Sequence, residues 1–457
     1  MLRKITTLNV SLRIQIIFII KSYLRNTKVM SNPLLIAAKG KGFLPMLARS
    51  RMIVNRYGLT AGKMDAALTA LMEPLTHYSC SATIPVTASA LASNPGAIKK
   101  NSLKGLEFAV HGLYHVDYSQ LNLEQQLKHI REARGIFHQL DIPVAGFRCP
   151  YLRWNKDTLI ALEETGFDYD SSQALSMDVV DEFSTETYHR VLDFYRAQSA
   201  NDYPALPSWS DNLIRIPYCL PDDEALIDRL HITDTGIMAH IWLAMLDHVY
   251  QSGELFTLGL HPERASACQA ALHAVLAKAR SLSPSVWIAR LDEIAAWFRS
   301  LGQTTCKIEN EGGSLYYVQI IGPKRATVLV RSSEIIAPTQ PWDIDYKAVC
   351  TNEFFLRSDK RPLVGLTPSS SISLQRFLRC QGYLVELSAD SEDYSVYLDR
   401  DTFSREDERP LLAELKQDHR PLVRLSRWPD AARCGLAITG DVDAFTIWDY
   451  GKRIFIR

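Results

Sequence analysis

The chain has 457 residues, of which 51 are basic and 51 acidic, and its apolar fraction is 47%. This length allows two or three domains, and the balanced charge gives no reason to expect nucleic acid or an anionic membrane surface as a partner. No apolar stretch reaches the roughly 18 residues that a membrane span needs. The eight cysteines form no C-x-x-C pair, which favours reduced thiols in a cytoplasmic protein over a disulfide framework.

The first 29 residues are ambiguous. Basic residues precede an apolar run at 14–20, as in a short signal sequence, but no small-residue cleavage site follows it cleanly. We interpret residues 1–29 as an amphipathic or disordered N-terminal extension.

Helix-like and strand-like segments alternate over about 250 residues after this extension. Apolar positions at helical spacing predict helices over 60–75, 123–139 and 158–166. Apolar and β-branched runs predict strands over 80–88, 108–112, 144–151, 213–218 and 255–262. The alternation predicts an α/β fold with a deformed (β/α) barrel of about seven strands.

The pattern changes at about residue 305. Residues 305–425 contain several strand-like runs and one long helical segment, 371–381, which predicts a separate, smaller α+β domain without a reactive constellation. Residues 426–457 then close the chain with an apolar strand at 434–439. The main part of the barrel is therefore expected within 30–304, and the role of the small domain stays open.

Two motifs at opposite ends of the chain carry the residue types of a metal site. HGLYH places His111 and His115 after one predicted strand, and GDVDA places Asp441 and Asp443 after another. Two histidines and a carboxylate commonly bind a divalent metal that keeps a position open for water, and a second carboxylate can take that water's proton. If residues 111–115 turn helically, the i, i+4 spacing places both imidazoles on one face.

Each motif also has a plain structural interpretation. The histidines could be a surface or capping pair, and Asp and Gly are both common in ordinary turns. However, two carboxylates next to a buried strand are costly unless a cation neutralises them, which favours metal binding at Asp441 and Asp443.

Two further polar residues follow predicted strands, where barrel active sites are built. His261 in LGLHPE could be a general acid, or a strand-end histidine satisfied by a backbone carbonyl. Arg148 in FRCPY could pair with a carboxylate and tune its pKa, or be a solvated loop arginine.

HGLYH, FRCPY and LHP resemble, in this order, motifs of the polysaccharide deacetylases, and GDVDA resembles that family's first motif. The resemblance covers roughly residues 50–300 and the C-terminal thirty. It implies a divalent metal, which we expect to be zinc, with His111, His115 and Asp443 as ligands. It also implies Asp441 as the base, Arg148 as the residue that orients it, His261 as the acid and the backbone N–H of Tyr151 as an oxyanion donor.

The order of the motifs departs from the family pattern, because the aspartate motif normally comes first. The segment RYGLTAG, the helix after it and the strand SATIPV resemble one branch that includes hydrolases of cyclic amides, but the aspartates that should precede them stand at the other end. We predict a circular permutation in which 426–457 supplies the first barrel strand. The rival is a truncated second domain, which would leave the first domain without its carboxylates.

These inferences predict a metal-dependent hydrolase of C–N bonds, foremost a deacetylase of an N-acetylated carbohydrate. A hydrolase of a small linear or cyclic amide is the first alternative, favoured a little by RYGLTAG. The second is a non-catalytic carbohydrate-binding or scaffolding protein, which applies if the C-terminal aspartates do not reach the histidine pair. Neither the substrate nor the oligomeric state can be inferred from these motifs.

Overall fold

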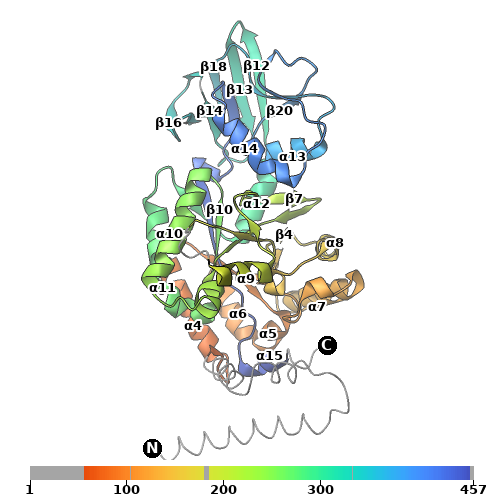
Figure 1. The fold of residues 1–457 in the computed structure, drawn as a ribbon, viewed down its shortest axis with the longest axis vertical. Helices are drawn as coiled ribbons and strands as arrows, with labels where there is room; N and C mark the ends of the chain where they lie inside the picture. Colours follow the sequence, from red (N-terminus) through yellow and green to blue (C-terminus); the bar gives the residue numbers. More distant parts are fainter. Residues whose placement is uncertain (1–55, 103, 180–184, 332, 453–457) are drawn as a thin grey trace, which may run out of the picture. The chain divides into compact units, whose positions relative to one another are not determined.

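The larger part of the fold is built on a 12-stranded sheet of mainly parallel strands, with strand order β6-β5-β9-β10-β23-β1-β2-β3-β4-β8-β7 and with β11 paired to β23. Strands β4, β7 and β10 of this sheet are labelled in Figure 1. The computed structural model describes residues 56–452 except 103, 180–184 and 332, so the extension expected over 1–29 lies outside the described residues. Within the described part of the chain, no helix is long and apolar enough to cross a membrane.

The middle of the sheet consists of six strands that pair in parallel with one another. They are β10 (Leu255–Gly259), β23 (Cys434–Thr439), β1 (Ala82–Val86), β2 (Glu107–Val110), β3 (Gly146–Phe147) and β4 (Tyr169–Asp170). Shorter strands extend it: β5 (Ala174–Ser176), β6 (Gln198–Ser199), β7 (Ser208–Ser210), β8 (Leu213–Arg215), β9 (Tyr218–Leu220) and β11 (Val286–Ile288). The α/β class and the barrel-like sheet are confirmed, and the two- and three-residue strands raise the count above the seven expected.

Amphipathic helices cover this sheet. They include α4 (Gly62–His77), α5 (Ala88–Ser93), α6 (Pro95–Ser102), α7 (Leu123–Gln139), α8 (Lys156–Glu164), α9 (Glu186–Tyr195), α10 (Thr235–Ser252), α11 (Ala265–Ser281) and α12 (Leu291–Gly302). Helix α7 shows why the helical spacing predicted its bounds: Ile130, Ala133 and Phe137 are buried on one face. Its start is fixed by a capping box between Asn122 and Gln125, which satisfies two backbone N–H groups.

The C-terminal strand β23 lies inside the sheet, between β1 and β10, and all six of its residues are buried. Its parallel partners are β10 along one edge and β11 followed by β1 along the other, so no apolar strand edge is left at this point. At its end, Gly440 leaves no space for a side chain, because a Cβ there would lie 1.6 Å from the carbonyl oxygen of Leu260. The chain then continues into α15 (Ile447–Lys452).

Helix α15 lies beside the segment that precedes α4. The backbone N–H of Ile447 donates to the carbonyl of Gly58 over 3.0 Å, and the rings of Tyr57 and Tyr450 are 5.4 Å apart between centroids. The two ends of the described chain are therefore neighbours in space, although almost 400 residues separate them in sequence.

Residues 305–425 form three smaller sheets. The first contains β12 (Thr305–Gly312), β13 (Leu315–Ile321), β18 (Glu353–Arg357) and β15 (Glu334–Ile336), and the second β16 (Thr339–Pro341), β17 (Tyr346–Val349), β14 (Val328–Arg331) and β22 (Leu422–Leu425). The third contains β20 (Val385–Leu387), β19 (Arg361–Leu366) and β21 (Tyr394–Leu398), and helices α13 (Ile372–Cys380) and α14 (Glu408–Gln417) accompany it. A shared apolar core that includes Val328, Leu356 and Val423 joins the first two sheets.

Candidate active site

The histidine pair lies in a bent loop directly after β2. A helical turn over 111–115, the condition under which the i, i+4 spacing would place both imidazoles on one face, is not formed: these residues are in bend and irregular conformations. Gly112 makes the bend possible, because its φ is +77° and a Cβ there would lie 2.9 Å from the ring of Tyr118. The loop still brings the two imidazoles together, with ring centroids 5.2 Å apart.

One nitrogen of His111 is already engaged. Its Nδ1 lies 3.0 Å from the backbone carbonyl of Arg148, which can only accept a hydrogen bond, so Nδ1 carries the hydrogen. The lone pair of the neutral ring is then on Nε2. This is the arrangement in which a protein histidine is oriented to bind a metal.

Asp443 completes a three-residue cluster with the histidines. Its Oδ1 lies 3.2 Å from His115 Nε2 and 3.5 Å from His111 Nε2. One possible ligand atom from each residue lies within 4.8 Å of the other two. The structure thus brings the C-terminal carboxylate to the histidine pair.

Asp441 lies beside this cluster and is held by Arg148. Its Oδ2 is 3.6 Å from His111 Nε2, and its Oδ1 accepts a 2.8 Å bond from Arg148 Nη1. Burial raises the pKa of Asp441, but His111 and Arg148 outweigh burial and hold it below its usual value. Asp441 is therefore ionised at neutral pH, as a base must be.

Arg148 is fully buried, and its guanidinium lies against Asp441. Its remaining donors reach Thr439 Oγ1, the carbonyl of Ser171 and the hydroxyl of Ser171, each over 3.0 Å. Its guanidinium also lies 4.6 Å from the ring centroid of Tyr218. The solvated-loop interpretation of Arg148 is wrong, because these contacts place it in the core.

Tyr151 borders the histidines from the loop after β3. Its backbone is in the left-handed region, with φ +59°, and its ring lies edge-on to His115 with centroids 4.3 Å apart. The side chain is 37% exposed, which places it at the solvent side of the cluster. The role of its backbone N–H as an oxyanion donor stays a prediction.

His261 follows β10 and is paired with an aspartate that the sequence analysis did not single out. Its Nδ1 lies 2.7 Å from Asp223 Oδ1, and its backbone N–H donates to Asp223 Oδ2 over 2.7 Å. Burial lowers the pKa of His261, but the Asp223 carboxylate outweighs it and raises this pKa well above its usual value. The available sequence signal was PDDE at 221–224, shortly after the predicted strand 213–218.

Asp222 lies next to this pair, so Asp222, Asp223 and His261 form a second group of possible metal ligands. Both carboxylate oxygens of Asp222 already accept hydrogen bonds, one from the Tyr218 hydroxyl and one from the backbone N–H of Ala225, each over 2.7 Å. Burial and the neighbouring Asp223 raise the pKa of Asp222 to about 6. These contacts favour proton transfer over metal binding in the second group.

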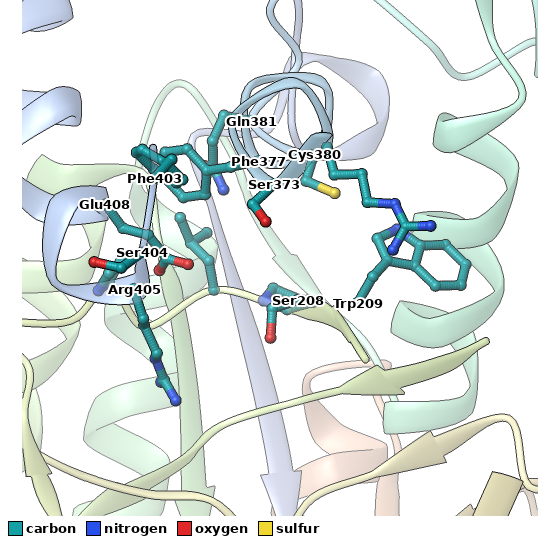
Figure 2. Close-up of a pocket in the computed structure, with 14 residues that line it drawn as sticks. Ser208, Trp209, Ser373, Phe377, Cys380, Gln381, Phe403, Ser404, Arg405 and Glu408 are labelled. Carbon is teal, nitrogen blue, oxygen red and sulfur yellow. The ribbon is translucent and has the colours of Figure 1, made fainter. Parts of the chain in front are cut away.

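None of the seven predicted site residues lines the cavity shown in Figure 2. This cavity has a volume of about 250 Å³. Its walls come from residues within 204–209, beside strand β7 of the large sheet, and from residues within 305–425 such as Phe377, Phe403 and Glu408. The predicted site residues therefore lie at the ends of β2, β3, β10 and β23 and not in this cavity.

Comparison with known proteins gives one family and several structural likenesses. Residues 61–169 match the polysaccharide deacetylase family model, which confirms the resemblance over β1, β2 and β3, and no curated protein matches the chain. A protein described as a probable polysaccharide deacetylase from Pseudomonas aeruginosa PAO1 is 22% identical over 51% of this chain and 73% of its own, with a TM-score of 0.41. A Mycobacterium smegmatis protein, likewise described as a polysaccharide deacetylase, is 21% identical over 54% and 81%, with a TM-score of 0.41. Puue allantoinase is 21% identical over 51% and 72%, with a TM-score of 0.41.

Proposed function

We propose that this chain, whose residues 61–169 match the polysaccharide deacetylase family, is a metal-dependent hydrolase that removes the acetyl group from an N-acetylated carbohydrate. One observation carries the proposal: Asp443 lies 3.2 Å from His115 and 3.5 Å from His111, while Asp441 next to it is paired with Arg148. A carboxylate for the metal and a carboxylate for the proton are thus held separately.

The donor set fits a divalent metal. It combines two imidazole Nε2 atoms with one carboxylate, and three protein ligands leave a position open, as in catalytic zinc sites. His111 is also oriented through its Nδ1 by a backbone carbonyl, as metal-bound histidines usually are. We therefore propose zinc as the ion and His111, His115 and Asp443 as its ligands.

When bound, such an ion would polarise the amide carbonyl and lower the pKa of water. The chain's own residues supply the proton transfers. Asp441, kept ionised by Arg148, takes a proton from the attacking water. His261, kept protonated by Asp223, gives a proton to the departing nitrogen. The backbone N–H of Tyr151 would donate to the oxyanion that forms on the carbonyl oxygen.

A hydrolase of a small linear or cyclic amide remains the second candidate. It rests on RYGLTAG, whose Gly58 accepts a hydrogen bond from Ile447, three residues after the GDVDA motif. The same ligands, base and acid would act on either substrate, so only an assay with both kinds of amide separates the two candidates.

We also propose that the chain is circularly permuted relative to the family pattern. Two observations support a permutation over a truncated second domain: β23 lies between β1 and β10, and the ring of Tyr57 contacts that of Tyr450. Moving residues 426–457 to a position just ahead of Arg56 should preserve metal binding and activity. Loss of both in a folded rearranged chain would contradict the permutation.

The test of function is metal content measured together with product release. We expect near-stoichiometric metal in the wild-type protein, loss of it in Asp443→Ala and His111→Ala, and retention in the exposed-histidine control His138→Ala. Acetate release from N,N′-diacetylchitobiose supports the deacetylase, and ring opening of hydantoin without acetate release supports the small-amide hydrolase. Absence of metal from all four proteins would leave the non-catalytic binding protein.

A further inference from the structure

A second cavity, of about 210 Å³, lies at the opposite end of the sheet from the candidate active site. One wall comes from residues that precede β10 and β23, namely Gln251, Ser252, Glu254, Arg427 and Arg433. His261 and Asp441 instead follow these two parallel strands. The other wall comes from residues within 305–425 and includes Trp342, Tyr346 and Tyr383.

The lining of this cavity carries an excess of positive charge. It contains the five cations Arg409, Lys416, Arg424, Arg427 and Arg433 but only the two carboxylates Glu254 and Asp343, a difference of three. Each carboxylate already has a partner, because Asp343 pairs with Arg433 over 2.8 Å and Glu254 pairs with Arg409. Within the part of the chain that the structure describes, no carboxylate lies within 4.0 Å of the other three cations.

Two of the arginines have a structural role. Arg433 donates to the carbonyls of Tyr250 and Gln251, and Arg427 lies 3.3–3.4 Å from those of Ser252 and Gly253. These carbonyls end helix α10, where positive charge is stabilising. Burial, followed by the charges of Arg424 and Arg433, lowers the pKa of Arg427 to about 10, so the arginines repel one another here.

Arg424 has no comparable partner. It is 6% exposed, its Nε has no hydrogen-bond partner, and its only contact with an acceptor among the described residues is 3.5 Å from Nη1 to the carbonyl of Gln381. The side chain of Gln381 is directed to the neighbouring cavity (Figure 2), and only its backbone carbonyl lies near Arg424. A guanidinium group offers five N–H donors, and leaving them unused in a buried position is costly.

The surroundings of Arg424 fix its position. The ring centroids of Tyr346, Tyr383 and Trp342 lie 4.9, 5.4 and 5.5 Å from its guanidinium carbon. Aromatic faces attract a cation but accept none of its N–H groups as a carboxylate would. The rings therefore hold the guanidinium in place and leave its donors for another group.

We propose that this cavity is a binding site for a small oxyanion, either a phosphate or a carboxylate group, with Arg424 as the central contact. The planar guanidinium matches both groups with two parallel hydrogen bonds, and Arg427 and Lys416 add positive charge. The small volume suits an ion or a small molecule and not a polymer. Because this site lies away from the predicted metal ligands, it stands independently of the proposed hydrolase activity.

Isothermal titration calorimetry with inorganic phosphate and with citrate, at constant ionic strength and with chloride as reference, tests the site. The titrations use a His111→Ala background, so that phosphate binding to a metal at the active site does not contribute. We expect saturable binding of phosphate, citrate or both, weakened at least tenfold by Arg424→Gln. Phosphate binding alone would identify a phosphate site, and citrate binding alone a carboxylate site.

Arg420→Gln is the matched control, because Arg420 lies four residues earlier, is solvent-exposed and pairs with Asp418. It should bind as the parent protein does. If Arg424→Gln does not fold, Lys416→Glu tests the same point, since this exposed side chain lines the cavity and its reversal should weaken binding several-fold. No binding beyond the chloride reference, or equal binding by parent, Arg424→Gln and Lys416→Glu, overturns the proposal.

Discussion

Two clusters at the same end of the sheet contain the same residue types but different hydrogen bonds. In the cluster of His111, His115 and Asp443, the backbone carbonyl at Arg148 takes the hydrogen of His111 Nδ1, and the Nε2 atoms face a carboxylate. In the cluster of His261, Asp222 and Asp223, the imidazole is itself bonded to a carboxylate. The partners of Asp222 are a tyrosine hydroxyl and a backbone N–H.

The partner of Nδ1 therefore differs between His111 and His261, and with it the form of the imidazole that is favoured. A backbone carbonyl leaves a neutral imidazole with a free lone pair, which suits a metal ligand. A buried carboxylate stabilises the imidazolium form, which suits a proton donor. Counting histidines and aspartates cannot separate these cases, because both clusters meet the distance criteria for metal ligands.

The largest expected effect comes from removing a ligand of the first cluster. Asp443→Ala should lower kcat/KM by about a thousandfold or more, because several kcal/mol of transition-state stabilisation depend on the ion. Elemental analysis should show the metal gone in the same preparation. A variant that loses activity while keeping its metal would remove Asp443 from the ligand set.

The second cluster should respond differently. His261→Gln should keep the metal and lower kcat by about 10²–10⁴-fold, as expected for loss of a general acid. If His261→Gln instead releases the metal, the division of roles between the two clusters is wrong.

The pH profile sharpens the same point. The Asp223 carboxylate raises the pKa of His261, so the protonated acid persists above its ordinary range and activity should fall only as pH rises through this higher pKa. Asp223→Asn removes the carboxylate and should move that fall to lower pH, which kcat measured against pH would reveal. An unchanged profile would show that another group is the acid.

Both clusters depend on the register of β23 and β10, which a glycine substitution can disturb. Gly440→Ala would place a Cβ 1.6 Å from the carbonyl of Leu260 and should reduce the free energy of unfolding by about 3 kcal/mol or more, measured by urea denaturation. Gly135→Ala is the control, because no atom lies within 4 Å of its Cβ in helix α7, and it should be neutral or stabilising by up to about 1 kcal/mol. Equal stability of the two variants would mean that the strands move apart easily.

The smallest effect concerns Glu107, at the start of the strand that leads to His111. Arg148 keeps Asp441 ionised, whereas the hydrogen-bond partners of the Glu107 carboxyl among the described residues are Thr83, Tyr169 and the backbone N–H of Asp292. Burial raises the pKa of Glu107 to about 7. The folded protein thus binds this proton more tightly than the unfolded chain does. Stability should fall by about 1–3 kcal/mol as pH rises from about 4.5 to 7.

Glu107→Gln should remove most of this decline, because glutamine has no proton to lose in that range. Urea denaturation of both proteins across these pH values measures it. An equally steep decline in the variant would assign the pH dependence to other groups.

Many elements could be predicted because their causes are local. The spacing of Ile130, Ala133 and Phe137 predicted helix α7 over 123–139, and the apolar run at 434–439 predicted β23 with the same bounds. The conformation of 111–115 could not be predicted, because the i, i+4 spacing of the histidines says nothing of Gly112, whose positive φ bends the chain into a loop and not a helical turn. Asp223 was missed because its role depends on His261, 38 residues later.

The sequence alone therefore determined the residue types of the site, the strands that carry them and the family that they resemble. These features depend on short-range periodicity and on motifs a few residues long. Only the tertiary structure decided that β23 inserts between β1 and β10, that Asp443 reaches the histidine pair and that Arg148 and Asp223 tune the pKa values of Asp441 and His261. Some of these contacts join residues more than 300 positions apart in sequence. Electrostatic interactions and hydrogen bonds act only at short distance, so they take effect only after the sheet has brought these residues together.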